Sequence, residues 1–195
     1  MTAPASETPT SIDQVADQAA GLKSTLTDIY SSVYAEPPYF WGKEHAQLFA
    51  ERFAAQRQAP GFDLVVARAG GDVVGYAFGV TLQPNTPWWT TVTTPVDTEL
   101  VTEWPGRTFA LVELLVSRPW RRRGIAKRLH DRLLDGRPEQ RATLTVLPDA
   151  HPAQHAYRAW GWHRVAQKSN PLPGAPTFDV MLKDLHERPY NSGGR

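Results

Sequence analysis

The sequence has no cysteine, and this absence excludes several kinds of chemistry. Disulfide bonds, thiolate nucleophiles and cysteine-ligated zinc sites cannot form among the 195 residues. The chain also lacks a strong charge imbalance, because 21 basic and 20 acidic residues leave a net charge of +1. This balance gives no overall reason to expect a nucleic-acid or membrane partner. No apolar run approaches the roughly 20 residues of a membrane-spanning helix, and we expect a reducing, cytoplasmic location.

The length of the chain favours a single domain with one hydrophobic core. Residues 1–10 are rich in Thr, Pro, Ala and Ser, and they have neither the basic start nor the apolar centre of a signal peptide. We predict a disordered tail there, a single domain over residues 11–186, and a C-terminal tail over residues 187–195.

An amphipathic helix is predicted near the N-terminus. Ser11 and Gln14 have the spacing of a capping box, and apolar residues then recur every three or four positions over residues 12–33. A coiled coil would show the same spacing. Because the run is short and Gly21 interrupts it, packing against a sheet is favoured.

Strands and helices alternate along the rest of the chain. The pattern predicts helices over residues 43–58, 127–134 and 152–160, and strands over residues 62–69, 73–82, 109–116, 141–147, 162–166 and 178–182. Residues 83–107 form a long loop rich in Pro, Trp and acids, of a kind that is often functional. The element order predicts an α/β fold with a mixed, mostly antiparallel central sheet and flanking helices.

A basic glycine turn lies between the central strand and the next helix. It consists of Arg121, Arg122, Arg123, Gly124, Ile125 and Ala126. The N–H groups and the positive dipole end at a helix start form a seat for a phosphate, and guanidiniums strengthen it. Gly124 has no Cβ and lets a ligand approach the backbone. Acids balance the arginines that follow the turn, which favours a phosphate site over a nucleic-acid interface.

The segment over residues 113–126 resembles the acetyl-CoA signature of the GCN5-related N-acetyltransferases, the GNAT family. The family motif Gln/Arg-x-x-Gly-x-Gly/Ala is matched by Arg121, Gly124 and Ala126, and the second signature by Ala153, Tyr157, Gly161 and Trp162. The resemblance covers about residues 65–182 and implies an acetyl-CoA-dependent N-acetyltransferase. The family's usual first strand is not evident before the first predicted helix.

The resemblance also implies where the donor acetyl-CoA would bind. The six residues of the turn would hold the pyrophosphate, and the pantetheine arm would lie along the backbone of Leu115 and Val116. The Val116 N–H would then stabilise the thioester oxygen. The family often has a cofactor-contacting Asn where this chain has Ala150, and the neighbouring His151 is the candidate replacement.

Two residues are predicted to transfer protons. Glu113 is the only charged residue within residues 109–116, and burial would raise its pKa and make it a general base for the amine. An acid that pairs with an arginine is the alternative. Tyr157 matches the family's general acid and would protonate the leaving thiolate. A core tyrosine with a hydrogen-bonded hydroxyl is the alternative for it.

The acceptor is predicted to be a primary amine of a small molecule, which attacks the thioester directly. The candidate substrate-binding residues are aromatic, and they are Tyr34, Tyr39, Trp41, Trp88 and Trp89. Acids such as Glu36 or Glu99 would attract the cationic amine. These aromatic residues could equally close the core.

Other functions remain as alternatives. A non-catalytic acyl-CoA-binding module or an acetyltransferase of peptide or protein amines would use the same turn. His151 and His155 have the spacing of two metal ligands, but no third ligand is evident, and we expect no metal. We further expect no nucleic-acid or membrane partner, and we consider a homodimer.

Overall fold

The computed structural model describes residues 10–169 and 176–186. Its strands are β1 (Thr10–Gln14), β2 (Asp63–Ala69), β3 (Asp72–Thr81), β4 (Thr108–Val116), β5 (Arg141–Val146), β6 (His163–Ser169) and β7 (Thr177–Asp184). They form one sheet in the order β1-β2-β3-β4-β5-β7-β6. β4 and β5 are parallel, whereas the pairs β1–β2, β2–β3, β5–β7 and β6–β7 are antiparallel. The predicted mixed, mostly antiparallel sheet is confirmed.

The chain divides into two compact units. The first unit comprises Met1–Val80 and Leu111–Asp135, and the second comprises Thr81–Ala110 and Gly136–Arg195. Strand β4 therefore starts in the second unit and ends in the first. The single domain over residues 11–186 stays a prediction, and the two predicted tails lie outside the described residues except for Thr10.

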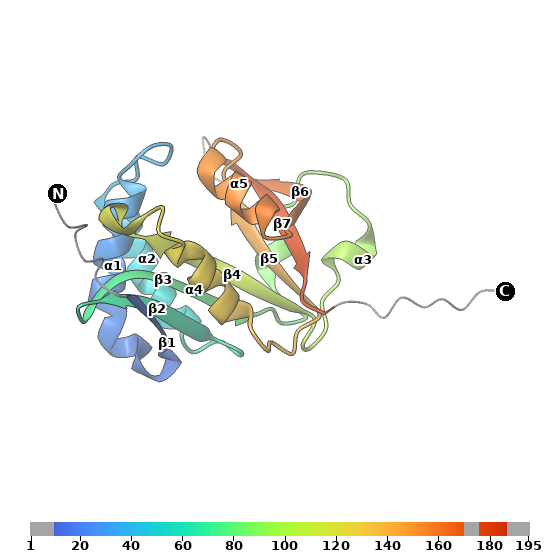
Figure 1. Cartoon of the computed structure of the whole chain (residues 1–195). Coiled ribbons are helices and arrows are strands. Elements are labelled where there is room, and N and C mark those ends of the chain that lie inside the picture. The colour runs from blue at the N-terminus through green and yellow to red at the C-terminus, as the bar shows by residue number, and fades with distance from the viewer. Residues whose placement is uncertain (1–9, 170–175, 187–195) are drawn as a thin grey trace. The chain divides into compact units, whose positions relative to one another are not determined.

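The first unit is built around a sheet of β1, β2, β3 and the end of β4. Its helices are α1 (Ala19–Tyr34), α2 (Lys43–Gln56) and α4 (Ile125–Leu134). Figure 1 shows α1 and α2 behind these strands and α4 in front of them. Apolar and aromatic side chains of α1 and α2 pack against Tyr76 and Phe78 of β3 and Leu115 of β4. Glu113 precedes Leu115 by two residues, so its side chain faces the same helices.

The predicted helix over residues 12–33 is wrong at its start. Thr10–Gln14 is strand β1, a short 3-10 helix over Ala16–Gln18 follows, and α1 begins at Ala19. The Ser11 hydroxyl donates to the Asp13 carboxylate at 2.8 Å instead of capping a helix. The cause is pairing with β2, because the ladder from Thr10↔Ala69 to Gln14↔Val65 satisfies the backbone of this segment. The strand that was not evident from the sequence is thus present.

The second unit packs α5 (His151–Ala159) against the strands β5 and β7. The Gln154 side-chain amide donates to Asp179 of β7 at 2.9 Å, and the Lys183 ammonium donates to the Trp160 carbonyl at 2.6 Å. Pro152 lies in the first turn of α5, where its missing N–H costs nothing. Gly161, with φ of 88°, ends the helix in the left-handed conformation. The helix and the three strands predicted here are confirmed within one to three residues.

The long loop over residues 83–107 also belongs to the second unit, and it contains the short helix α3 (Thr98–Val101). Buried polar groups anchor it. One oxygen of Glu103 accepts hydrogen bonds from Trp89, Thr108 and Arg141 at 3.0, 2.8 and 3.1 Å. A loop of this length is therefore ordered by side-chain bonds to its flanking strands.

Candidate active site

The turn before α4 presents backbone donors that suit an anion. Gly124 is the residue before the helix, with φ of 73°, and no side chain caps this end. The first N–H groups of a helix have no intrahelical acceptor. No backbone acceptor within the described part of the chain is recorded for the N–H groups of Arg122, Arg123 and Gly124. A Cβ added to Gly124 would meet no atom within 4 Å, so the space there is open.

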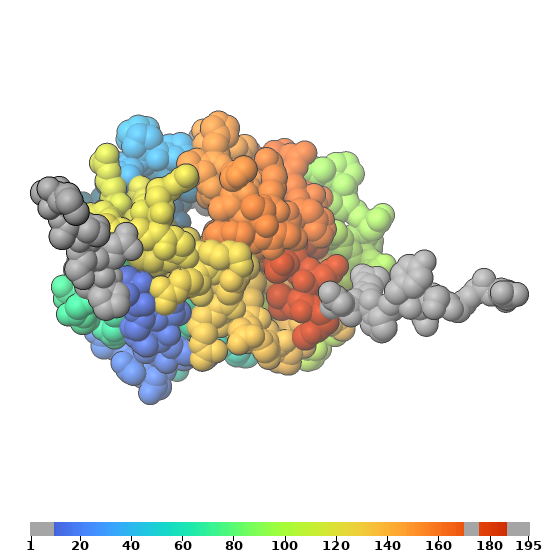
Figure 2. Space-filling view, viewed as in Figure 1, coloured from blue at the N-terminus to red at the C-terminus, as the bar shows by residue number. Residues whose placement is uncertain are grey.

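Figure 2 shows the turn and α4, in yellow, at the surface of the first unit. The open space, the unused N–H groups and the helix dipole fit a pyrophosphate group such as that of coenzyme A. The guanidinium of Arg123 lies over the Trp120 ring at 4.9 Å. This contact holds one cation next to the turn.

The side chain of Arg121 binds to other groups of the protein. Its Nη1 donates to Glu36 at 2.7 Å, and its Nε donates to the Val116 carbonyl at 3.0 Å. Glu36 lies just after α1, so the ion pair connects the segment between α1 and α2 to the end of β4. The guanidinium is thus engaged within the protein, and the backbone of the turn provides the donors for an anion.

Glu113 lies near the end of β4 among aromatic residues of the first unit. It is 7% exposed, and the Tyr34 hydroxyl donates to its Oε2 at 2.8 Å. No basic side chain of the described residues forms an ion pair with it. The charge of Arg52 nevertheless acts on this carboxyl, so the alternative of an acid that answers a neighbouring arginine stays open.

The surroundings of Glu113 change its acidity. Burial raises the pKa of its carboxyl from 4.5 to about 7, while the hydrogen bond from Tyr34 and the charge of Arg52 act in the opposite direction. A carboxyl with a pKa near neutrality holds and releases a proton at physiological pH. This property suits a general base and costs stability when the group ionises.

Three of the five predicted acceptor residues lie together beside Glu113. The Tyr34 ring stacks on Trp41 at 4.6 Å and meets Tyr39 edge-on at 4.6 Å. Trp41 in turn stacks on His45 at 5.2 Å. This aromatic cluster, formed by Tyr34, Tyr39, Trp41 and His45, joins the end of α1 to the start of α2 next to the carboxyl of Glu113.

The backbone at the end of β4 has a defined direction. The Ser117 N–H donates to the Val74 carbonyl at 2.9 Å, so Ser117 directs its amide toward β3. Backbone direction alternates along a strand that has neighbours on both sides. The N–H of Val116 consequently points away from β3. Leu115 and Val116 are both buried, at 7% and 8% exposed.

Tyr157 and His151 belong to the second unit. Tyr157 lies in the last turns of α5, is 9% exposed, and its ring contacts Trp160 and Trp162 edge-on at 5.8 and 6.0 Å. His151 is exposed at the first position of α5, where no side chain caps the helix. The roles of both residues stay predictions.

Trp88 and Trp89 lie in the loop of the second unit. The Trp89 indole donates to Glu103, and the Lys168 ammonium lies over the Trp88 ring at 4.6 Å and donates to the Trp88 carbonyl at 2.6 Å. The Lys168 contacts fasten the loop to β6, and Glu103 in turn accepts a hydrogen bond from Thr108 at the start of β4. The substrate role predicted for the two tryptophans stays a prediction.

Residues 10–169 and 176–186 contain no group of three or more His, Asp or Glu placed to hold a metal ion. Across the same residues, no helix has the length and hydropathy needed to cross a membrane.

Sequence reasoning missed several neighbours of Glu113. Tyr30 and Arg52 both lie close enough to Glu113 to interact with its charge. The buried Tyr76 hydroxyl has no hydrogen-bond partner among the described residues, and burial, followed by the charge of Glu113, raises its pKa. The four-residue spacing of Tyr30 and Tyr34 on one helix face was a usable signal. Nothing in the sequence indicated Arg52.

The chain matches the model of the Acetyltransferase (GNAT) family over residues 26–162. This match spans more than half of the chain, and the protein therefore belongs to the GNAT family of acetyltransferases. A sequence search among curated proteins finds no significant match.

Solved structures share the fold at low sequence identity. An aminoglycoside 6'-N-acetyltransferase complexed with coenzyme A is 17% identical, with a TM-score of 0.64 and coverage of 92% of this chain and 99% of that chain. The ribosomal-protein-S18-alanine N-acetyltransferase of Escherichia coli is 14% identical, with a TM-score of 0.62 and coverage of 95% and 100%. The yncA protein of Salmonella typhimurium, solved with its cofactor acetyl-CoA, is 14% identical, with a TM-score of 0.62 and coverage of 92% and 96%.

Proposed function

We propose that this protein transfers an acetyl group from acetyl-CoA to the primary amine of a small molecule. The observation that carries the proposal is the buried carboxyl of Glu113, whose pKa of about 7 lets it accept a proton at neutral pH. Family membership supports the reaction class, and the open backbone donors before α4 support a pyrophosphate-bearing donor. A cytoplasmic location and a homodimer stay further expectations.

Glu113, Val116 and Tyr157 have separate proposed roles in the acetyl transfer. An alkylamine with a pKa of ~10 is mostly protonated at neutral pH and must lose a proton before it attacks. Glu113 accepts that proton, directly or through a water molecule. The amine nitrogen bonds to the thioester carbon, and the Val116 N–H donates to the carbonyl oxygen as its charge grows. The carbon–sulfur bond then breaks, and Tyr157 donates its proton to the sulfur.

The turn and its neighbours hold the donor during this reaction. The backbone N–H groups from Arg122 to Ala126 bind the pyrophosphate, and Arg122 and Arg123 add positive potential. Leu115 and Val116 bind the pantetheine arm through their backbones. His151, at the start of α5, is proposed as a further contact to the cofactor.

The aromatic cluster supports a small amine as the acceptor. Tyr34, Tyr39 and Trp41 place aromatic faces beside Glu113, and such faces attract ammonium groups. Glu36 is paired with Arg121 and contributes less free negative charge than its sequence position suggested. Two of the similar structures differ in the acceptor that their names give: one is an aminoglycoside 6'-N-acetyltransferase, and the other acetylates an alanine of ribosomal protein S18. Peptide amines are therefore the second candidate for the acceptor.

A turnover screen tests the proposal. The full-length protein is incubated with acetyl-CoA and matched panels of small amines and of peptides with free N-termini, and thiol release is measured. We expect turnover with small amines. Turnover with peptide N-termini alone would replace the acceptor class. Thermal stabilisation by acetyl-CoA without turnover of any amine would favour a binding module, and salt-dependent DNA binding without stabilisation by coenzyme A would favour a nucleic-acid protein.

A further inference from the structure

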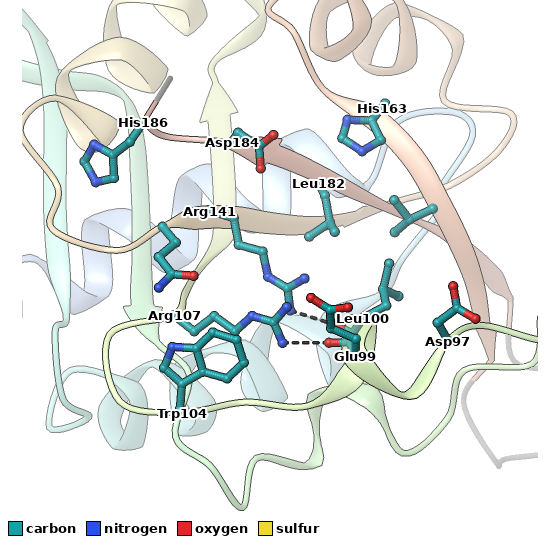
Figure 3. Close-up of a pocket in the computed structure, with 12 residues that line it drawn as sticks. Asp97, Glu99, Leu100, Trp104, Arg107, Arg141, His163, Leu182, Asp184 and His186 are labelled. Atoms are coloured by element: carbon teal, nitrogen blue, oxygen red, sulfur yellow. Dashed lines mark hydrogen bonds between the residues drawn. The ribbon is translucent and has the colours of Figure 1, made fainter. Parts of the chain in front are cut away.

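The second unit contains a pocket of ≈ 690 Å³ that the proposed acetyl transfer does not use. Residues of β5, β6 and β7 line it together with the segment that carries α3, as Figure 3 shows. Its two arginines, Arg107 and Arg141, lie at the starts of β4 and β5. Glu113 and Val116 lie near the end of β4, so the pocket lies at the opposite end of this strand from them.

The two arginines are held in place by the chain but keep unused donors. Nη1 of Arg107 donates to the carbonyls of Glu99, at 2.7 Å, and Thr102, while Nη2 of Arg141 donates to the Leu100 carbonyl at 2.8 Å and to Glu103 at 3.1 Å. Nε of Arg141 donates to Thr108 at 2.8 Å. No acceptor in the described part of the chain is recorded for Nη2 of Arg107 or Nη1 of Arg141. Both atoms are accessible to solvent.

The pair of guanidiniums favours an anion. Burial lowers the pKa of Arg141, and the neighbouring charge of Arg107 lowers it further, whereas Glu103 and Asp184 act in the opposite direction. A negative group between two like charges relieves their repulsion. A carboxylate also matches the planar fork of a guanidinium. The Trp104 ring lies 3.9 Å from the Arg107 guanidinium and fixes its plane.

The opposite end of the pocket carries negative charge. In Figure 3, Asp97 lies at the end away from Trp104, and the side chains of Leu100 and Leu182 lie between the arginines and this acid. Asp184 lines the upper edge. Glu99 also lines the pocket beside the two guanidiniums, and Glu103 is paired with Arg141 at 3.1 Å. A ligand that spans the pocket therefore meets the unused guanidinium donors, with these acids next to them, at one end, an apolar middle, and the Asp97 carboxylate at the other.

We propose that this pocket binds a small zwitterion, with its carboxylate on Arg107 and Arg141, its apolar body over Leu100 and Leu182, and its ammonium group beside Asp97. The ligand class is an amino acid whose two charged groups are separated by a short apolar chain. The site does not depend on the proposed acetyl transfer, and binding alone tests it.

Calorimetric titration of the full chain with a matched series of compounds provides the test. 4-Aminobutyrate and 6-aminohexanoate carry both charged groups, whereas hexanoate and hexylamine carry one each. We expect at least one amino acid to bind about tenfold more tightly than hexanoate, and hexylamine to bind weakest. At about ten times its Kd, the amino acid should raise Tm by about 3 °C. Failure of both amino acids to bind at about 10 mM, well above the usual range of small-ligand sites, would overturn the proposal.

Variants separate the two ends of the site. Asp97→Asn should lower the affinity for the amino acid to that for hexanoate and leave hexanoate binding unchanged. Asp72→Asn, an exposed acid in the hairpin between β2 and β3, is the matched control and should change neither affinity. Arg107→Gln should remove binding of both compounds. Because Arg107 also anchors the α3 segment, the fold of Arg107→Gln is checked by circular dichroism. If Arg107→Gln does not fold, the result for Asp97→Asn decides whether the proposal holds. Unchanged amino-acid binding by Asp97→Asn would contradict the assignment.

Discussion

Glu139 of the second unit and Glu113 of the first unit are both buried, but they differ in what surrounds them. Glu139 in the second unit is 2% exposed, and it accepts hydrogen bonds from Arg137 at 2.9 Å and from the Thr81 hydroxyl at 2.5 Å. Glu113 in the first unit is 7% exposed, and a phenol is its recorded hydrogen-bond donor within the described residues. Burial acts to raise the pKa of both carboxyls. In Glu139 the bonds from Arg137 and Thr81 outweigh burial and lower the pKa, whereas in Glu113 burial prevails.

The comparison shows that a bound cation decides what a buried acid can do. Glu139 is stabilised as an anion, so it has little tendency to take up a proton and serves the structure. Glu113 has tyrosine in place of a paired cation, so its carboxyl stays ready to exchange a proton near pH 7. The same residue type thus has a structural task in one unit and is proposed to have a chemical task in the other.

The largest expected effect is the loss of the base. Glu113→Gln keeps the shape and a hydrogen-bond acceptor for Tyr34 but cannot accept the amine proton. We expect kcat/KM to fall by ~10³, within the usual range for a lost general base, with the affinity for acetyl-CoA nearly unchanged. Steady-state kinetics and calorimetry measure the two quantities. Full activity in this variant would remove Glu113 from the mechanism.

The ionisation of Glu113 should also appear in the stability of the protein. A carboxyl whose pKa rises on folding keeps its proton in the folded state while the unfolded state releases it, so stability falls as pH rises from 4.5 to about 7. The loss amounts to up to about 3 kcal/mol, since each pKa unit corresponds to roughly 1.4 kcal/mol. Urea unfolding at a series of pH values measures it. Glu113→Gln should flatten this part of the profile, and an identical slope in both proteins would contradict the assigned pKa.

The second unit is expected to contribute its own proton donor. Tyr157→Phe removes the hydroxyl and retains the ring contacts with Trp160 and Trp162, so the fold should persist. We expect kcat to fall by ~10², the lower end for a lost general acid, while the Kd for acetyl-CoA changes little. An unaltered kcat would leave Tyr157 as a core residue and confine the chemistry to the first unit.

Breaking the paired glutamate should affect stability and spare turnover. Glu139→Gln removes the carboxylate that Arg137 and Thr81 bind, and we expect a loss of about 2 kcal/mol of unfolding free energy, measured by urea denaturation. The kcat/KM of this variant serves as the control for Glu113→Gln and should stay near that of the unmodified protein. Equal losses of activity in the two variants would erase the distinction between the two acids.

The sequence was sufficient for most of the fold because the decisive signals were local. The hairpin of β2 and β3, the central strand β4 and the glycine turn before α4 all follow from neighbouring residues. Strand β1 was missed because its apolar spacing continues into α1, and the ladder with β2, more than fifty residues away in sequence, decided its conformation. Local periodicity cannot show such a partner.

One feature of the candidate site, the buried acid, could be predicted in the same way. A single acid within an apolar strand indicated Glu113, because burial of an unpaired carboxyl is costly without a purpose. Its partners were not predictable, since Tyr34 is 79 residues away in sequence and reaches Glu113 only through the packing of α1 on β4. The ion pair of Glu36 with Arg121, separated by 85 residues, was hidden for the same reason.

The smallest expected effect concerns the phenol that distinguishes the environment of Glu113 from that of Glu139. The hydrogen bond from Tyr34 lowers the pKa of Glu113, so Tyr34→Phe should raise that pKa and move the rise of kcat/KM with pH to higher pH. A shift of about one unit would lower turnover about fivefold at pH 7 and leave it unchanged at high pH, where the carboxyl is ionised in both proteins. Tyr39→Phe, whose ring lies in the same aromatic cluster, is the matched control and should keep the original profile. A pH-independent loss of activity in Tyr34→Phe would instead assign Tyr34 to binding of the amine, because a binding defect persists after Glu113 has ionised.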